Sequence, residues 1–340
     1  MDAERCEKLA ERLERQLSTE QCLAMAERLR QRALGSLGEV VLQEKAKRAD
    51  LHRKCPRCGH GDVVKHGRDG STGRQRFRCR KGEAGGCGRT FNPVTGSPLA
   101  RLRKPARWLP MAQAMAEHRS VKRTADALGM APGTVLRWRH RALPAQATRQ
   151  APQVRGVVAA DETYFRASFK GHRGWKRGDP PAPRMPRYRG ESALRPGLSA
   201  EQVPVLTAVD RTGNVVERVL GSRAEIAPAL DGRIEPGSVV CSDGEKAYAA
   251  AASKARSEHR RIDPPKKDWV KKAVGGKPRK PGRMGLGRVN AHHERLKTFV
   301  NRQARGVSTR FLPHYLGWHR ALRRPGFSHT DLLTDLLIHS

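Results

Sequence analysis

Two aspartates end apolar runs in a chain that is otherwise strongly basic. Asp161 closes the run that begins at Val154, and Asp243 closes the run that begins at Gly237. Carboxylates that face one another at strand ends hold divalent metal ions, and such ions bring phosphodiester chemistry to a polyanion. The two aspartates therefore predict an enzyme that acts on nucleic acid, beyond mere binding.

A third polar cluster lies on a stretch that is predicted to be helical, from Asn290 to Lys297. At about 100° per residue, one face of this helix carries Asn290, His293, Glu294, Lys297 and Asn301, and the other carries Val289, Leu296, Phe299 and Val300. An amphipathic surface helix would have the same pattern. Beside Asp161 and Asp243, the pattern predicts a polar face that is turned toward the two aspartates.

The composition favours a polyanionic partner. The sequence has 68 Lys and Arg against 33 Asp and Glu, a net charge of +35 that is spread over its whole length. Basic side chains neutralise phosphates, so we expect double-stranded DNA as the partner; a solvated basic surface is the alternative. No apolar run reaches the roughly 18–20 residues of a membrane span, and the N-terminus has no apolar signal core. We expect no membrane partner and a cytoplasmic, chromosome-associated protein.

Four of the seven cysteines have the spacing of a zinc ribbon. Cys55 and Cys58 form a Cys-Pro-x-Cys knuckle, and Cys79 and Cys87 follow as a second, more widely spaced pair. Short strands are predicted at 63–67 and 74–78, around a turn. Four thiolates bind one structural Zn²⁺ tetrahedrally, and the metal would supply the folding energy of so small a segment.

Helices are predicted on both sides of the ribbon. Leucines at three- and four-residue steps predict a helix over residues 4–34. Two helices are predicted at 108–118 and 121–128. Gly129 is typical of a helix end, and Pro132 is typical of the first position of a third helix. The pair around this turn resembles a helix-turn-helix, whose second helix would carry Arg137, Arg139 and Arg141 toward DNA; a plain helical hairpin is the alternative.

From residue 153 onward, short apolar runs alternate with turns and helices. We predict a buried strand at 154–160, a hairpin from Val203 to Leu220, a strand at 239–241 and a helix at 245–256. This order is that of an RNase H-like core, which would bring Asp161 and Asp243 together across the sheet. Asp210 lies in the hairpin turn and is predicted to be structural. Glu162 would point to the opposite strand face from Asp161.

The sequence resembles the DDE transposases of bacterial insertion sequences that carry an N-terminal zinc ribbon. The resemblance covers roughly residues 50–325. It rests on Cys-Pro-x-Cys at 55–58, Asp161-Glu-Thr-Tyr-Phe, Glu201-Gln-Val-Pro-Val-Leu, Ser242-Asp-Gly, Val289-Asn-Ala-x-His and Tyr315-Leu-Gly-Trp-His-Arg.

The resemblance implies a metal-dependent nuclease and strand transferase with Asp161 and Asp243 as metal ligands. It puts the third acidic position at Asn290 and Lys297 seven residues further on. An amide oxygen is a weaker Mg²⁺ ligand than a carboxylate, so Glu294 on the same face is an alternative third ligand. We expect two Mg²⁺ ions, for which Mn²⁺ can substitute. Lys297 would contact DNA phosphate, and His293 would assist a ligand or the phosphate or else be structural.

Two basic inserts flank these strands, near 166–190 and 264–288. They include Lys176 and Arg177 in the first and Lys271 and Lys272 in the second. Their Gly and Pro content predicts loops that become ordered on DNA.

The fold class that we predict is multidomain α+β. The domains are a helical N-terminal region (1–48), a zinc ribbon (49–98), a helix-turn-helix (104–143), a linker (144–152), the catalytic domain (153–325) and a tail (326–340). The predicted function is a transposase that binds element ends and target DNA as at least a dimer. The alternatives are a DNA-binding regulator with a decayed catalytic domain and an RNase H-like nuclease without strand transfer.

Overall fold

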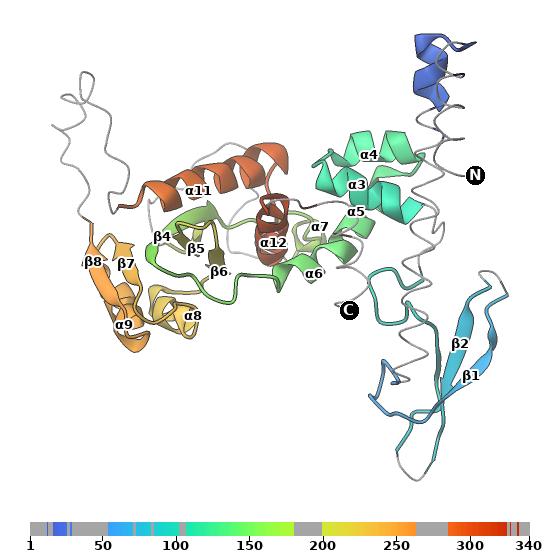
Figure 1. The fold of residues 1–340 in the computed structure, drawn as a ribbon, viewed down its shortest axis with the longest axis horizontal. Helices are drawn as coiled ribbons and strands as arrows, with labels where there is room; N and C mark the ends of the chain where they lie inside the picture. Colours follow the sequence, from blue (N-terminus) through green and yellow to red (C-terminus); the bar gives the residue numbers. More distant parts are fainter. Residues whose placement is uncertain are drawn as a thin grey trace. The chain divides into compact units, whose positions relative to one another are not determined.

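The structure, a computed structural model, describes residues 12, 16–25, 28, 54–70, 73–82, 85–101, 107–179, 199–262, 285–324, 327 and 332. The fold is mixed α/β, with a three-stranded and a five-stranded sheet (Figure 1). Residues 1–145 together with 325–340 form one compact unit, and residues 146–324 form another. Within the described ranges, no helix has the length and apolar character needed to cross a membrane.

The helix predicted over residues 4–34 lies mostly outside the described residues. Residues 19–25 are helical, and Leu17 and Ser18 interrupt the helix before them. The backbone N–H of Ser18 donates to Gln21 Oε1 at 2.9 Å, and that of Gln21 donates to Ser18 Oγ at 3.3 Å. This reciprocal cap begins a new helix, so the prediction of one continuous helix is wrong at this point.

The small sheet follows the cysteine knuckle. It consists of β1 (Val63–Arg68), β2 (Gln75–Cys79) and β3 (Thr90–Phe91), in antiparallel order. The rings of Phe77 and Phe91 stack with their centroids 5.6 Å apart and form the centre of a small core. The structure confirms the two predicted strands. It adds β3, which is too short to give a periodic signal in the sequence.

Three helices follow in the same unit, as predicted. They are α3 (Trp108–Ala116), α4 (Val121–Leu128) and α5 (Pro132–Ala142). Ser120 Oγ accepts from the N–H of Arg123 at 3.2 Å and caps α4. Gly129 ends α4 in the left-handed conformation, with φ of 54°, and Pro132 opens α5 because the first helical position needs no N–H donor.

The large sheet belongs to the second unit and has the order β6-β5-β4-β7-β8. The strands β4 (Val157–Arg166), β5 (Gln202–Asp210) and β6 (Val215–Val219) form an antiparallel meander. The strands β7 (Val239–Ser242) and β8 (Glu258–Arg261) run parallel to β4. The antiparallel meander and the parallel edge thus meet at β4, which is the central strand.

Helices cover both faces of this sheet (Figure 1). On one face, α8 (Ile226–Leu230) and α9 (Lys246–Lys254) pack on a core that includes Val158, Leu206 and Val240. On the other face lie α11 (Gly287–Lys297) and α12 (Leu312–Leu322). A π-helical segment, Thr298–Gln303, directly continues α11. Because side chains alternate along a strand, neighbouring residues of β4 face different helix layers.

Two predictions about the strands need correction. The central strand was expected at 154–160, but β4 spans Val157–Arg166, and Val154 makes only an isolated bridge to Ile234. Asp161 therefore lies in the middle of the strand, because β5 pairs with β4 as far as Arg166 although the apolar run ends earlier. The edge strand β8 was missed because its sequence, Glu-His-Arg-Arg, is polar, as is common at a sheet edge.

The segment predicted as a linker, 144–152, is partly ordered structure. It begins with the short helix α6 (Pro144–Ala147), in which Ala145 and Gln146 are buried. Further along, Gln150 Oε1 accepts from the backbone N–H of Glu217 at 3.0 Å. Residues 146–150, which we call the connector, are thus fastened to the second unit.

The hairpin between β5 and β6 confirms the structural role predicted for Asp210. Its carboxylate accepts from the backbone N–H groups of Thr212 and Asn214, both at 2.9 Å, and from that of Arg155 at 3.2 Å. Burial alone would raise the pKa of Asp210, but the hydrogen bonds from Thr212 and Asn214 hold it below its usual range. The residue closes the turn and anchors the segment before β4.

Candidate functional site

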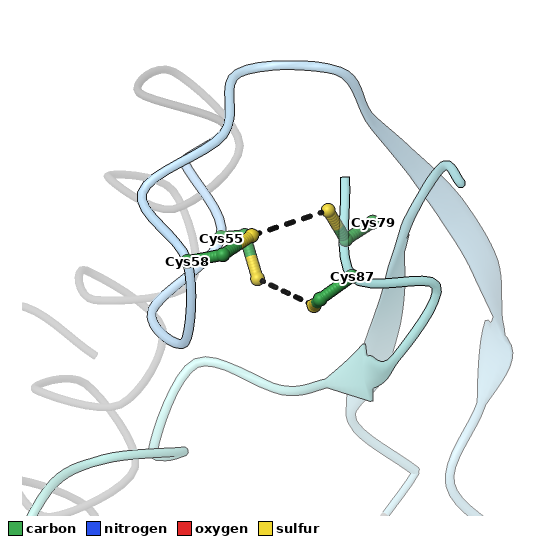
Figure 2. Close-up of side chains that lie close together, drawn as sticks. All are labelled: Cys55, Cys58, Cys79 and Cys87. Atoms are coloured by element: carbon green, nitrogen blue, oxygen red, sulfur yellow. Dashed lines mark hydrogen bonds between the residues drawn. The ribbon is translucent and has the colours of Figure 1, made fainter. Parts of the chain in front are cut away.

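The four predicted zinc ligands converge on one point of the ribbon. Cys55 and Cys58 lie in the knuckle before β1, Cys79 ends β2, and Cys87 precedes β3. The two knuckle sulfurs face the other two (Figure 2). The Sγ atoms of Cys55 and Cys87 are 3.6 Å apart, those of Cys58 and Cys79 are 3.7 Å apart, and all four lie within 4.8 Å of one another.

These distances fit one zinc ion. Thiolates at about 2.3 Å from a tetrahedral Zn²⁺ lie about 3.8 Å from each other. The four cysteines form no disulfide, so all four sulfurs are available to a metal. The backbone N–H of His60 lowers the pKa of Cys58 to about 6, whereas burial raises the pKa of Cys79 to about 11. A bound metal would have to displace the proton of Cys79. The cluster can therefore bind zinc as the spacing predicted.

The arginines predicted to face DNA from α5 do not share one face. Arg137 and Arg141 are exposed, with Arg137 donating to Thr134 Oγ1 at 3.2 Å and Arg141 to the backbone oxygen of Ala100 at 2.6 Å. Arg139 is 6% exposed, and its guanidinium donates to the backbone oxygen of Arg119 at 2.8 Å. The prediction that Arg139 faces DNA is wrong, because alternate residues of a helix point in nearly opposite directions.

This difference gives a paired test. We expect Arg139→Ala to lower the free energy of unfolding by about 2 kcal/mol, because it removes a buried charged donor from a backbone acceptor. Arg137→Ala should leave the melting temperature unchanged and weaken DNA binding. Thermal unfolding and a DNA titration on the same two proteins make the measurement. Equal melting temperatures for the two variants would show that the hydrogen bond from Arg139 to the backbone of Arg119 does not stabilise the fold.

Asp161 lies within β4 on the face that α11 covers, and Asp243 follows the end of the neighbouring strand β7. In the parallel ladder, Val157 pairs with Val239 and Ala159 with Cys241. The strand β7 ends at Ser242, so Asp243 lies in the bend directly after it, beyond the last paired residues of this ladder. The carboxylate of Asp243 also raises the pKa of Asp161 by repulsion, which requires that the two groups are close.

Residues of α11 complete the surroundings of Asp161. His293 Nδ1 lies 3.9 Å from Asp161 Oδ2, and the positive charge of Lys297 lowers the pKa of Asp161. As predicted, the apolar face of this segment packs: Val289, Leu296, Phe299 and Val300 are all buried. His293 is also buried, and its Nε2 has no hydrogen-bond partner within the described part of the chain.

Asn290 and Glu294 lie on the exposed side of α11. Among the described residues, no hydrogen bond or ion pair joins either side chain to the two aspartates. The helix therefore brings His293 to Asp161, while Asn290, Glu294 and Lys297 all lie on its exposed side.

The electrostatics of the pair suit a divalent cation. Burial raises the pKa of Asp161 to about 6, the carboxylates of Glu162 and Asp243 raise it too, and Lys297 opposes them. Asp161 is half-buried and Asp243 is exposed, and acidic groups that repel one another are stabilised when a cation lies between them. The Mg²⁺ site at these two residues stays a prediction. Close three-ligand sets of Asp, Glu, His or Cys occur, among the described residues, at the four cysteines and at Glu217, His292 and His319.

Glu162 faces the other helix layer, as predicted from strand alternation. Its Oε1 accepts from the hydroxyl of Tyr248 on α9 at 2.5 Å. Burial and the charge of Asp243 raise the pKa of Glu162, which the Tyr248 hydrogen bond opposes. The negative charge of Asp243 thus acts on both neighbouring acids of β4.

The basic inserts are only partly described. Lys176 and Arg177 are exposed on the short helix α7 (Gly174–Arg177). The start of the first insert is tied down, because the N–H of Thr309 donates to the backbone oxygen of Ser168 at 2.9 Å. Lys271 and Lys272 lie outside the described residues, so their DNA-binding role stays a prediction.

One buried cluster was not predicted from the sequence. It consists of Glu217 on β6, His292 on α11 and Arg320 on α12. Glu217 Oε1 lies 2.6 Å from His292 Nε2, and Oε2 lies 2.7 Å from an Arg320 guanidinium nitrogen. The alternation of side chains along β6 could have predicted its burial, because Glu217 lies on the same face of the strand as Val215 and Val219.

The chain matches no protein-family model and no curated protein.

Proposed function

We propose that this chain is a DNA transposase, which cuts the ends of an insertion sequence and joins them to target DNA in a metal-dependent reaction. The observation that carries the proposal is the pairing of β4 with β7, the two strands that lead to Asp161 and Asp243, together with the effect of the Asp243 charge on the pKa of Asp161. A pair of carboxylates with a lysine near it is suited to holding metal ions and a phosphodiester together.

The arrangement of strands and helices supports an RNase H-like catalytic domain. An antiparallel meander, β4–β5–β6, continues through β4 into a parallel edge, and helices cover both faces. In the proposed site, the meander would supply Asp161, the segment after β7 would supply Asp243, and α11 would supply His293 and Lys297. The 3.9 Å approach of His293 Nδ1 to Asp161 Oδ2 supports this grouping.

Each residue has a distinct task in the proposed reaction. Two bound Mg²⁺ ions, or Mn²⁺ in their place, would supply the activation of the attacking oxygen and the charge neutralisation at the phosphate. Asp161 and Asp243 would hold the ions, with Asn290 or Glu294 as the third oxygen donor. Lys297 would bind a phosphate oxygen, and His293 would fix the carboxylate of Asp161. Water would attack the phosphodiester at the element end and break its P–O3′ bond, which leaves a 3′-hydroxyl on the element and a 5′-phosphate on the flank. That 3′-hydroxyl would then attack a target phosphodiester and displace a 3′-hydroxyl of the target strand.

The remaining parts of the chain fit the recognition of DNA. The net charge of +35 favours a polyanion. The helices α4 and α5, with Arg137 and Arg141 exposed, would form a helix-turn-helix that reads the terminal repeats together with the zinc ribbon. Both ends of an element must be held at once, so we expect at least a dimer on DNA, in the cytoplasm and associated with the chromosome.

Cleavage and joining of the DNA that flanks the gene test this proposal. With Mg²⁺, the wild-type protein should nick at specific positions and form joined products. Comparison of Asn290→Ala with Glu294→Ala then identifies the third ligand, because loss of it should slow cutting by about 100-fold or more. The other variant should cut at nearly the wild-type rate.

A second candidate function follows from Asn290, which is an amide where a third carboxylate would serve metal binding best. In that case the chain is a DNA-binding regulator whose catalytic domain has decayed. Tight and specific binding of the flanking DNA by the wild type, with no cutting in Mg²⁺ or Mn²⁺, would establish the regulator and reject the transposase.

A further inference from the structure

A closed ionic cluster lies between the large sheet and the helices α11 and α12. It consists of Glu217, His292 and Arg320, which we call the positioning cluster. The side chain of Glu217 is 0% exposed, that of His292 is 3% exposed and that of Arg320 is 8% exposed. His292 and Arg320 each engage one oxygen of Glu217, at 2.6 and 2.7 Å, so the carboxylate is fixed from two helices.

The cluster lies in the same row of the sheet as Asp161. Asp161 pairs with Thr207 across β4 and β5, and Thr207 pairs with Glu217 across β5 and β6. Directly opposed residues of an antiparallel pair point to the same face. The adjacent histidines of α11 contact the two ends of this row, because His292 binds Glu217 and His293 lies 3.9 Å from Asp161.

Two such contacts from consecutive residues define how α11 lies on the sheet. Consecutive residues of a helix are about 100° apart, so a rotation of α11 that kept His293 at Asp161 would separate His292 from Glu217. Apolar contacts are non-directional, whereas a hydrogen-bonded carboxylate permits one helix rotation. The rotation in turn decides whether Lys297 and the exposed stripe of Asn290 and Glu294 reach the aspartates.

Arg320 extends the cluster to the connector. Its Nε donates to the backbone oxygen of Arg149 at 3.3 Å, and a terminal nitrogen donates to that of Ala147 at 3.1 Å. One turn earlier in α12, Gly317 allows close packing, because a Cβ atom there would lie 2.3 Å from the backbone oxygen of Gln146. The same carboxylate thus joins the connector, β6, α12 and α11.

We propose that Glu217, His292 and Arg320 are positioning residues that set the rotation of α11 and so align its polar stripe with Asp161 and Asp243. The inference rests on the proposed function, because it assigns these residues a task in the same site. A buried ion pair contributes little net stability compared with apolar side chains of similar volume. What the positioning cluster contributes is one defined orientation of the helix.

A buried metal ion is the competing occupant of this place. The ligand atoms of Glu217, His292 and His319 lie within 4.8 Å of one another, and His319 Nδ1 has no partner in the described part of the chain. The guanidinium of Arg320 already neutralises Glu217, so a divalent cation would leave two uncompensated positive charges in a closed interior. The ionic cluster is therefore the better account.

The test replaces the whole cluster by apolar side chains, in the variant Glu217→Met, His292→Leu, Arg320→Met. Removing all three polar groups leaves no unpaired buried charge among them, so the variant should fold with a melting temperature near that of the wild type. Amide hydrogen exchange along α11 should become about tenfold faster or more, because charged hydrogen bonds no longer restrain the helix. Zinc content should stay at one per chain.

DNA cutting supplies the second readout on the same protein. We expect the cutting rate to fall by about 100-fold, the effect of a displacement near 1 Å, while the affinity for DNA stays the same. His292→Gln, which retains a donor, should restore most of the rate that His292→Leu loses. The exposed pair Asp231 and Lys254, 2.7 Å apart, is the matched control: Asp231→Asn with Lys254→Gln should change neither exchange nor cutting.

The exchange readout decides the inference even if the wild type cuts no DNA, which would reject the proposed function alone. Unchanged exchange in α11 of the folded triple variant would overturn the positioning role. Wild-type cutting by that variant would overturn it as well. A second zinc ion per chain that is lost in the triple variant would replace it by a metal site.

Discussion

Asp161→Asn should abolish DNA cutting and at the same time make the metal-free protein more stable. The loss of cutting follows from the proposed function, because an amide oxygen is a neutral and weaker metal ligand than the carboxylate it replaces. The gain in stability follows because burial, Glu162 and Asp243 all disfavour the charged form of Asp161. DNA binding should remain, since the substitution leaves the basic surfaces unchanged.

The size of this gain follows from the shift in pKa. The pKa of Asp161 rises from 3.8 to about 6 in the folded protein, which corresponds to about 3 kcal/mol. With allowance for the part of the side chain that water reaches, we expect about 2 kcal/mol. For a unit of this size, that is an increase of about 5 °C in melting temperature.

The pH dependence has a definite sign. Below about pH 3, Asp161 is protonated in both the folded and the unfolded state, so the carboxyl should have no effect on the difference in stability between wild type and variant. As the pH rises from about 4 to about 6, the unfolded state has lost its proton while the folded state keeps it, so the wild type loses stability; the difference should grow over this range and level off above about pH 7. Mg²⁺ should raise the melting temperature of the wild type and leave that of the variant unchanged.

Asp210→Asn is the matched control. It makes the same chemical change at a carboxylate whose charged form is stabilised by its surroundings, whereas the charged form of Asp161 is destabilised. The hydrogen bonds from Thr212, Asn214 and Arg155 stabilise the charged form, so this variant should be less stable and should still cut DNA. A stable Asp161→Asn variant that cuts at the wild-type rate would eliminate Asp161 as a metal ligand. Loss of DNA binding in that variant would also count against it.

Cys55→Ser should remove zinc from the protein and unfold the ribbon. The core of this segment is small, centred on Phe77 and Phe91, and metal binding supplies on the order of 10 kcal/mol in domains of this kind. Three remaining thiolates cannot complete the tetrahedral set. Zinc analysis and limited proteolysis between residues 54 and 101 measure the effect, and recognition of element ends should weaken.

The second unit should not respond to this substitution. Its thermal transition and the increase that Mg²⁺ produces should persist in Cys55→Ser, because no ribbon residue lies within residues 146–324. Cys22→Ser is the control for cysteine loss, since Cys22 lies on the short helix at 19–25 and outside the sulfur cluster. An unaltered zinc content in Cys55→Ser would contradict the ligand assignment.

Local patterns in the sequence were sufficient for most elements. The apolar runs at 203–220 and 239–241 predicted β5, β6 and β7, and the Gly129 and Pro132 signals predicted the boundaries of α4 and α5, since these depend on neighbouring residues alone. The strand β8 could not be predicted in this way, because its polar residues are held by pairing with β7 rather than by burial. For the same reason the end of β4 was misplaced.

The candidate site shows the same division between local and distant causes. The two aspartates were found from the sequence because each follows an apolar run. The burial of Arg139 was not found, since its partner is the backbone oxygen of Arg119 in another loop. Glu217 was missed because its partners come from α11 and α12, far along the chain. Buried ionic groups depend on such distant partners. The hydrophobic periodicity of a sequence indicates local structure and does not identify them.

The fastening of the connector has a mechanical consequence. Residues 146–150 are held by hydrogen bonds from the Arg320 guanidinium and by close packing against Gly317. A displacement of this segment would therefore move α12, and through Glu217 and His292 it would also move α11. Within the second unit, the entering segment and the helix that carries Lys297 are thus expected to shift together rather than independently.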